Sequence, residues 1–209
     1  MCALMYALMY VCRFIQIQFD MVEYYDFKLK MILIGSTNVG KSSIVSRFIN
    51  NDFSISQNQT IGIDIMTSMM NIYNYTVKVQ IFDTSGSKRF KSINSLYYSN
   101  ANVVIFCFDI TSRITFDDIK KAIQTFDNNI KKVLVGNKID MEHLRQIQYQ
   151  EALNFANENN MLYFETSAKN SIGINDVFTK VTENMTKSMI KEHLAEIKKY
   201  TELKIIFPK

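Results

Sequence analysis

The chain is poor in residues that interrupt folded domains, and it carries no strong excess of one charge. Its 209 residues include one proline and six glycines, so no proline- or glycine-rich linker divides it. The net charge is only +4, and there is no basic run of the kind that forms a nucleic-acid-binding arm. We therefore expect one domain with a sizeable core and no nucleic-acid partner.

Cysteine is also scarce. The three cysteines, Cys2, Cys12 and Cys107, lack the spacing of metal ligands, and Cys107 lies in an apolar run. An odd number of cysteines without a disulfide framework suits a reducing compartment. We expect a cytoplasmic protein.

The first 12 residues are almost wholly apolar. They are too few to span a bilayer, and they lack the basic start and the clear cleavage site of a signal peptide. Three alternatives stay open: the segment packs on the domain, it lies at a membrane surface, or translation begins at Met21. We expect an apolar extension over residues 1–23, outside the core domain.

The most informative stretch is residues 35–42, Gly-Ser-Thr-Asn-Val-Gly-Lys-Ser, which has the form G-x-x-x-x-G-K-[ST]. An apolar strand is predicted before it at Phe27–Ile34, and apolar residues at helical spacing follow it. In this arrangement, loop N–H groups and a helix N-terminus can hold phosphate. Lys41 is placed to reach the β- and γ-phosphates, and Ser42 to bind Mg²⁺. The alternative is a glycine turn with an incidental lysine.

The rest of the chain alternates apolar strands with helices. Strands are predicted at residues 63–72, 75–82, 103–108, 133–136 and 161–164, and helices at 114–126, 149–158 and 174 to about 197. This order predicts an α/β fold with a mostly parallel six-stranded sheet, one antiparallel hairpin strand and helices on both faces. Ligands of such sheets bind at the carboxyl ends of the strands.

Three further motifs lie at such strand ends. Asp83 begins Asp-x-x-Gly, where the acid can hold Mg²⁺ through water and the N–H of Gly86 can contact a γ-phosphate. Asp140 ends Asn-Lys-Ile-Asp and can accept two hydrogen bonds from guanine, whereas adenine would leave it unpaired. The stem of Lys138 can cover the base plane, and residues 166–169, Thr-Ser-Ala-Lys, can turn N–H groups towards the guanine O6. Each motif alone is also compatible with a simple turn or loop.

Together, in this order and spacing, the motifs resemble those of the Ras superfamily of small GTPases, and the Rab branch most closely. Further resemblance lies in residues 60–64, 97–101 and 108–111, and the whole covers about residues 27–190. It implies a P-loop NTPase small G domain over residues 24–192 and a C-terminal tail over residues 193–209. It also implies GTP or GDP with Mg²⁺, partners that exchange nucleotide, activate hydrolysis or act as effectors, and a role in vesicle trafficking.

The resemblance assigns roles to individual residues. Thr60 would bind Mg²⁺ and sense the γ-phosphate, and Phe53 would pack on the guanine edge. Residues 51–62 and 83–98 would be the two switches. The expected nucleotide-binding residues are Gly35, Ser36, Thr37, Asn38, Val39, Gly40, Lys41, Ser42, Ser43, Phe53, Thr60, Gly86, Asn137, Lys138, Asp140, Ser167, Ala168 and Lys169; the metal ligands are Ser42, Thr60 and Asp83; the catalytic residues are Lys41, Thr60, Gly86 and Ser87.

Two departures from the family pattern concern turnover. Ser87 stands where the family has the glutamine that orients the attacking water, and a serine is too short for that task. Thr37 and Asn38 are larger than the usual residues and would crowd a catalytic arginine from a partner. We expect slow hydrolysis. A GTP-binding docking protein with negligible turnover is one alternative; an ATP-using enzyme is another, against which Asp140 argues.

Other departures concern partners and membranes. Ile65 and Phe82 replace a phenylalanine and a tryptophan in an aromatic triad that effectors recognise, which Tyr97 completes. No cysteine follows Cys107, so the usual acceptors of prenyl groups are missing. We expect any peripheral association with endomembranes to depend on partners or on the N-terminal stretch.

Overall fold

The computed structural model describes residues 24–54, 60–86, 98, 100–126 and 130–206. Six strands form one sheet in the order β2-β3-β1-β4-β5-β6, in which β2 pairs antiparallel with β3 and the other neighbours pair in parallel. The strands are β1 (Phe27–Ile34), β2 (Ile63–Ile72), β3 (Tyr75–Thr84), β4 (Val103–Asp109), β5 (Lys131–Asn137) and β6 (Leu162–Thr166). The helices are α2 (Lys41–Asn50), α4 (Arg113–Ala122), α5 (Tyr149–Glu158) and α6 (Ile174–Ile206), with 3-10 segments η2 (Ile123–Thr125) and η3 (Ile139–Leu144).

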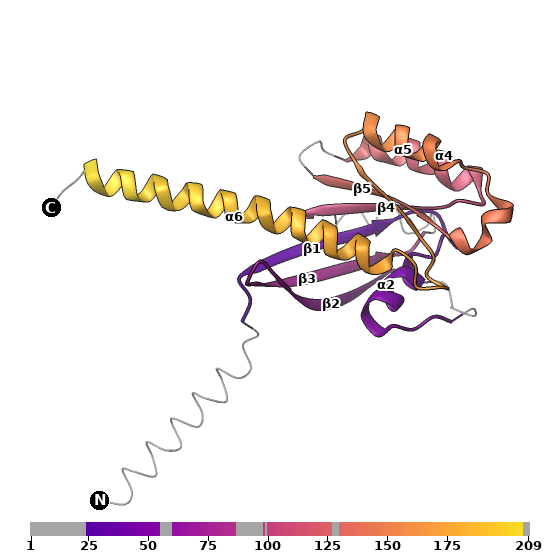
Figure 1. Ribbon diagram of the computed structural model, residues 1–209, viewed down its shortest axis with the longest axis horizontal. Helices are drawn as coiled ribbons and strands as arrows, with labels where there is room; N and C mark the ends of the chain where they lie inside the picture. The colour runs from indigo at the N-terminus through magenta and orange to yellow at the C-terminus, as the bar shows by residue number, and fades with distance from the viewer. Residues whose placement is uncertain (1–23, 55–59, 87–97, 99, 127–129, 207–209) are drawn as a thin grey trace, which may run out of the picture.

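Helices cover both faces of the sheet (Figure 1). On one face, apolar side chains that alternate along β1 and β3 pack with α2 and α6 around Phe178. On the other face, β4 and β5 pack with α4 and α5 around Phe116. All seven residues of β4 are buried, because both of its sides are covered. The predicted doubly wound α/β fold is confirmed.

The β2–β3 hairpin also forms where the sequence predicted it. Ile72 and Tyr75 are paired, and the two residues between them, Tyr73 and Asn74, have φ angles of 50° and 66°. A two-residue turn with two positive φ angles matches the right-handed twist of the strands that it joins.

The last helix extends further than predicted. α6 runs to Ile206 instead of about residue 197 and continues beyond the sheet as a single helix (Figure 1). No glycine or proline lies between residues 174 and 206 to end it, and residues 191–196 are all exposed. α6 therefore crosses the boundary expected at residue 192, and the division into domain and tail stays a prediction. The expected extension over residues 1–23 lies outside the described residues. Of the helices that the structure describes, none has the length and apolar character needed to cross a membrane.

Candidate functional site

The loops at the carboxyl ends of the strands enclose a cavity of about 560 Å³. Its size is that of a small-molecule binding site. The lining residues are Thr37, Asn38, Gly40, Lys41, Ser42, Ser43, Phe53, Ser54, Thr60, Thr84, Ser85, Gly86, Asn137, Lys138, Asp140, Met141, Ala168 and Lys169. The structure thus brings most of the expected nucleotide-binding residues around one space. The other expected residues, Gly35, Ser36, Val39 and Ser167, support the lining from behind, through contacts given below.

Lys41 is the first residue of α2 and directly follows the loop that leaves β1. Its side chain is buried, and its Nζ donates to the carbonyl oxygens of Gly35 at 2.9 Å and Ser36 at 3.0 Å. Burial lowers the pKa of Lys41, and the nearby charge of Asp83 opposes this shift. The first turn of α2 contains no acidic residue, so nothing local offsets its positive end. An anion is the ligand that this loop favours.

Two glycines let the surrounding backbone come close to this loop. Gly40 has a φ of 95°, and a Cβ there would lie 2.3 Å from Asn137 Nδ2. A Cβ on Gly86, at the end of β3, would lie 2.4 Å from the backbone nitrogen of Thr37. Gly86 is therefore held against the backbone of Ser36 and Thr37 in the loop before α2.

The three expected metal ligands meet beside Lys41. Ser42 Oγ lies 2.8 Å from Thr60 Oγ1 and donates to Asp83 Oδ2, to which Thr60 also donates at 3.4 Å. Asp83 Oδ1 is buried and has no hydrogen-bond partner among the residues that the structure describes. Burial raises the pKa of Asp83, against the hydrogen bond from Ser42 and the charge of Lys41.

This donor set fits Mg²⁺. The ion prefers oxygen ligands and usually takes few of them from the protein, leaving places for phosphate oxygens and water. Two hydroxyls and one carboxylate with an unsatisfied oxygen meet that requirement. Within the described part of the chain, there is no cluster of three or more His, Cys, Asp or Glu side chains that would form another metal site.

Asp140 and Asn137, which follow the same strand, make different contacts at the cavity. Asp140 accepts a hydrogen bond from Ser167 Oγ at 2.6 Å and lines the cavity. Asn137 donates to the carbonyl of Val39 at 2.9 Å and accepts from Thr166 Oγ1 at 3.1 Å. The asparagine side chain therefore ties the loop before α2 to the end of β6.

Lys138 is fixed by a contact that the sequence did not reveal. Its Nζ lies 2.7 Å from Asp109 Oδ2, while Asp109 Oδ1 accepts from the backbone N–H of Thr111 at 2.8 Å. Lys138 has a φ of 72°, which is unusual for a residue with a side chain. The ion pair fixes the ammonium group, and Lys138 lines the cavity.

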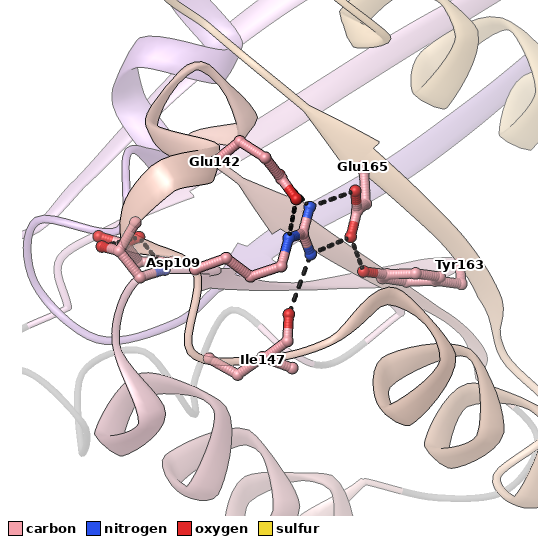
Figure 2. A network of polar contacts seen from close by, with 7 residues as sticks. Asp109, Glu142, Ile147, Tyr163 and Glu165 are labelled. Atoms are coloured by element: carbon pink, nitrogen blue, oxygen red, sulfur yellow. Dashed lines mark hydrogen bonds and ion pairs between the residues drawn. The ribbon is translucent and has the colours of Figure 1, made fainter.

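Arg145 joins η3 to the end of β6 through ion pairs with Glu142 and Glu165, two of the residues labelled in Figure 2. Its guanidinium contacts both carboxylate oxygens of Glu165, at 2.8 and 2.9 Å, and both of Glu142, at 2.7 Å each. It also donates to the carbonyl of Ile147, and Tyr163 donates to Glu165 at 2.6 Å. The Arg145 side chain is only 9% exposed, and its hydrogen bonds to Glu165 and Glu142 raise its pKa. η3 and the end of β6 are thus locked together.

Two more supporting contacts involve residues outside the motifs. Arg47 donates to the carbonyl of Ala168 at 2.9 Å, and its guanidinium lies 5.9 Å from the ring centre of Phe53. Ser36 donates to Asp118 on α4 at 2.7 Å. Sequence reasoning missed Arg47, Asp109, Asp118 and Arg145. The one signal for these contacts in the sequence was Glu165. A charged residue next to a buried motif requires a partner of opposite charge.

The structure describes only some of the residues at which the chain departs from the family pattern. Ser87 and Tyr97 lie outside the described residues, as does most of the second switch. Thr37 and Asn38 are both exposed at the mouth of the cavity. The roles assigned to the site residues stay predictions.

Comparisons with known proteins agree with this geometry. A family model described as "Ras family" matches residues 30–187. The chain is 36% identical over 174 residues to Ras-related protein RABA1e of Arabidopsis thaliana, covering 81% of this chain and 80% of the other. It is 36% identical over 174 residues to Ras-related protein rab-11.1 of Caenorhabditis elegans, covering 81% and 82%. It is 40% identical over 164 residues to Ras-related protein Rab-1 of Theileria parva, covering 76% and 74%.

Proposed function

The chain belongs to the Ras family of small GTPases, in its Rab-like branch, and we propose that its cavity binds GTP or GDP with Mg²⁺ and hydrolyses GTP slowly. One observation carries the proposal: Lys41 and Ser42, which is hydrogen-bonded to Asp83, line the same cavity as Asp140. A guanine nucleotide needs groups for its phosphates and a carboxylate for its base around one cavity.

Different residues would bind the phosphates, the Mg²⁺ ion and the base. Lys41, the loop N–H groups and the N-terminus of α2 stabilise negative charge on the phosphates. Ser42, Thr60 and Asp83 would hold Mg²⁺, which would neutralise charge between the β- and γ-phosphates. Asp140 accepts hydrogen bonds from guanine, and the stem of Lys138 covers the base.

Selectivity for guanine separates this function from an ATP-using enzyme. Adenine offers Asp140 no matching pair of donors, and a buried unpaired carboxylate is costly. Purified protein should therefore release GDP or GTP when denatured, and excess ATP should not displace a labelled GTP analogue. Release of adenine nucleotide would contradict the proposal.

Slow turnover is argued from Ser87. Its hydroxyl extends one bond beyond Cβ, so it does not reach an in-line water as a glutamine side chain does. Thr37 and Asn38 are both exposed at the cavity, and their bulk would crowd a catalytic arginine from a partner. A protein in this state would stay loaded with GTP until a partner supplies the missing group.

Single-turnover decay of [γ-³²P]GTP tests this point. Ser87→Gln should accelerate hydrolysis at least about tenfold, a barrier change of ~1.4 kcal/mol. Nucleotide affinity should barely change, because the residue acts mainly in the transition state. Ser188→Gln, on the exposed surface of α6, is the matched control and should leave the rate unchanged. Equal rates for wild type and Ser87→Gln would contradict the role given to Ser87.

The alternative is a GTP-binding docking protein with negligible turnover, which the same serine favours. It predicts no measurable phosphate release from wild type, even with a Rab-type activating protein. We propose that an exchange factor, an activating protein and effectors all act at this site, and that association with endomembranes is peripheral and depends on partners.

A further inference from the structure

Arg47, near the end of α2, contacts two segments that lie far apart in the chain. Its Nε donates to the carbonyl oxygen of Ala168 at 2.9 Å, and its Nη2 donates to that of Lys169 at 3.2 Å. Its Nη1 donates to the carbonyl oxygen of Asn51 at 2.8 Å. All three nitrogens of the guanidinium group therefore bind backbone carbonyl groups. One side chain joins the loop after β6 to the start of the first predicted switch.

The contact with the loop after β6 fixes the orientation of a peptide group at the cavity. Ala168 and Lys169 both line the cavity, and the described part of the chain contains no cis peptide bond. In a trans peptide the N–H points away from the C=O. Because Arg47 holds the carbonyl group of Ala168, it also sets the direction of the Lys169 N–H. This N–H is one of those that residues 166–169 are expected to turn towards the guanine O6.

The contact with Asn51 fixes the point at which the chain turns after α2. Asn51 has a φ of 52°, and its N–H donates to the backbone carbonyl of Arg47 at 3.1 Å. A left-handed residue with this hydrogen bond is a common way to end a helix. Two residues later, Phe53 lines the cavity, and its ring centre lies 5.9 Å from the guanidinium carbon of Arg47, within the range of a cation–π contact. Arg47 therefore also contacts the aromatic residue that is expected to pack on the guanine edge.

Helix α2 connects these contacts to the residues expected to bind phosphate and metal. Lys41 and Ser42 begin the helix, and Arg47 lies ~9 Å further along its axis. Ile44 and Val45, between them, are buried in the core and hold the helix against the sheet. The side chains proposed to bind the phosphates and the side chain that holds the loop after β6 therefore belong to one rigid element.

We propose that Arg47 is a positioning residue for the guanine base: it keeps the Lys169 N–H and the Phe53 ring in place to contact the base, and it thereby slows release of the nucleotide. This role rests on the proposed function, because it concerns the same site. A purely structural role, in which Arg47 only ends α2 and stabilises the fold, has a different consequence. Its loss would weaken binding of every nucleotide equally, whatever group the base carries at position 6.

The test compares two bases that differ only at position 6. 6-Thioguanosine diphosphate keeps both donors that Asp140 would accept, but its sulfur is a weaker hydrogen-bond acceptor than the O6 of GDP. Displacement of a fluorescent GDP from the full-length protein with Mg²⁺ gives the affinity for each nucleotide. Release rates are measured for fluorescent GDP and for a fluorescent, non-hydrolysable GTP analogue.

The variants are Arg47→Lys and, as a second variant, Arg47→Gln. Neither side chain can bind three carbonyl groups with one planar group as arginine does. Arg113→Lys is the matched control. Arg113 also donates to a backbone carbonyl, that of Gln146 at 2.8 Å, but it lies on α4, which packs on the other face of the sheet from α2. The thermal midpoint of every protein is measured to confirm that it is folded.

Both Arg47 variants should bind GDP about three- to tenfold more weakly, which is the range for one hydrogen bond. They should release GDP and the GTP analogue faster by the same factor, because the two share the base. Affinity for 6-thioguanosine diphosphate should fall less than about twofold, and Arg113→Lys should match wild type throughout. Equal weakening for the two bases, or unchanged release of GDP, would overturn the proposal. Failure of wild type to bind any guanine nucleotide would instead contradict the proposed function, and the role of Arg47 with it.

Discussion

At the scale of single residues, Asn137 and Asp140 have different predicted roles. Asn137 holds neighbouring segments together, and Asp140 is proposed to recognise the base. The Asn137 side chain is hydrogen-bonded to Val39, in the loop before α2, and to Thr166, at the end of β6. Asp140 has one oxygen bonded to Ser167 and faces the cavity. A change at Asn137 should therefore disturb the loops, whereas a change at Asp140 should alter which base is bound.

Asp140→Asn should reduce GTP affinity steeply. The amide presents a donor to guanine's own donors, and loss of two paired hydrogen bonds costs roughly 2–4 kcal/mol in a closed site. Xanthosine triphosphate, which offers an acceptor at that position, should bind better than it does to wild type. Competition against a fluorescent GTP analogue measures both affinities. Asp117→Asn on α4 is the control, and equal GTP affinity in Asp140→Asn and wild type would remove Asp140 from the base site.

At the scale of elements, Arg145 holds η3 to the end of β6. Arg145→Lys should destabilise the fold by roughly 1.5–3 kcal/mol, because lysine cannot form the paired contacts to a largely buried Glu165. GTP and GDP affinity should fall together, since both base-binding loops lose their support. Arg113→Lys is the matched control: Arg113 forms a similar pair with Glu151, but that pair is more than one-third exposed.

Because solvent screens the Arg113–Glu151 pair, its loss should cost about 0.5 kcal/mol or less. Nucleotide affinity should not change in Arg113→Lys. Chemical denaturation gives the stability of both variants, and nucleotide dissociation rates give the affinity effect. Equal loss of affinity in both variants would show that Arg145 has no special connection to the base-binding loops.

The close approach of β3 to the phosphate-binding loop gives a second prediction at this scale. Gly86→Ala places a Cβ 2.4 Å from the Thr37 nitrogen, so one backbone must move, at a cost of roughly 1–3 kcal/mol. If Gly86 contacts the γ-phosphate as proposed, GTP affinity should fall more than GDP affinity. Gly62→Ala is the control for stability: it has a φ of 82° but no atom within 4 Å of its Cβ. It should cost about 1–2 kcal/mol through backbone strain alone; because Gly62 lies in the first predicted switch, only the stabilities of the two variants are compared.

At the scale of the whole molecule, the sequence predicted features formed by contiguous residues and missed contacts between residues far apart in the chain. The phosphate-binding loop and the hairpin turn at Tyr73 and Asn74 are contiguous patterns, so their strands and helix were predictable. The contacts of Ser36 with Asp118 and of Arg145 with Glu165 join residues 82 and 20 positions apart. Such pairs depend on how helices pack on the sheet, which periodicity does not specify. The end of α6 was missed for another reason: no glycine or proline interrupts residues 174–206, and the first residue that excludes a helix is Pro208.

If Asp83 holds Mg²⁺ as proposed, the metal should affect the stability of the whole fold. Asp83 is 3% exposed, and one of its oxygens has no partner within the described structure. A buried carboxylate in this state destabilises the fold until a cation compensates its charge. The residue is thus unfavourable for folding alone and favourable only with the ligand.

Asp83→Asn should therefore have opposite effects with and without Mg²⁺. In GDP-loaded protein with excess EDTA, removing the charge should raise the free energy of unfolding by about 1 kcal/mol, or about 2–4 °C in thermal midpoint for a chain of this size. With millimolar Mg²⁺, wild type should gain stability by mass action, because the ion binds only the folded site. Asp83→Asn should gain little, so the order of the two midpoints reverses. Asp117→Asn should respond to Mg²⁺ as wild type does, and an unchanged Mg²⁺ response in Asp83→Asn would place the ion elsewhere.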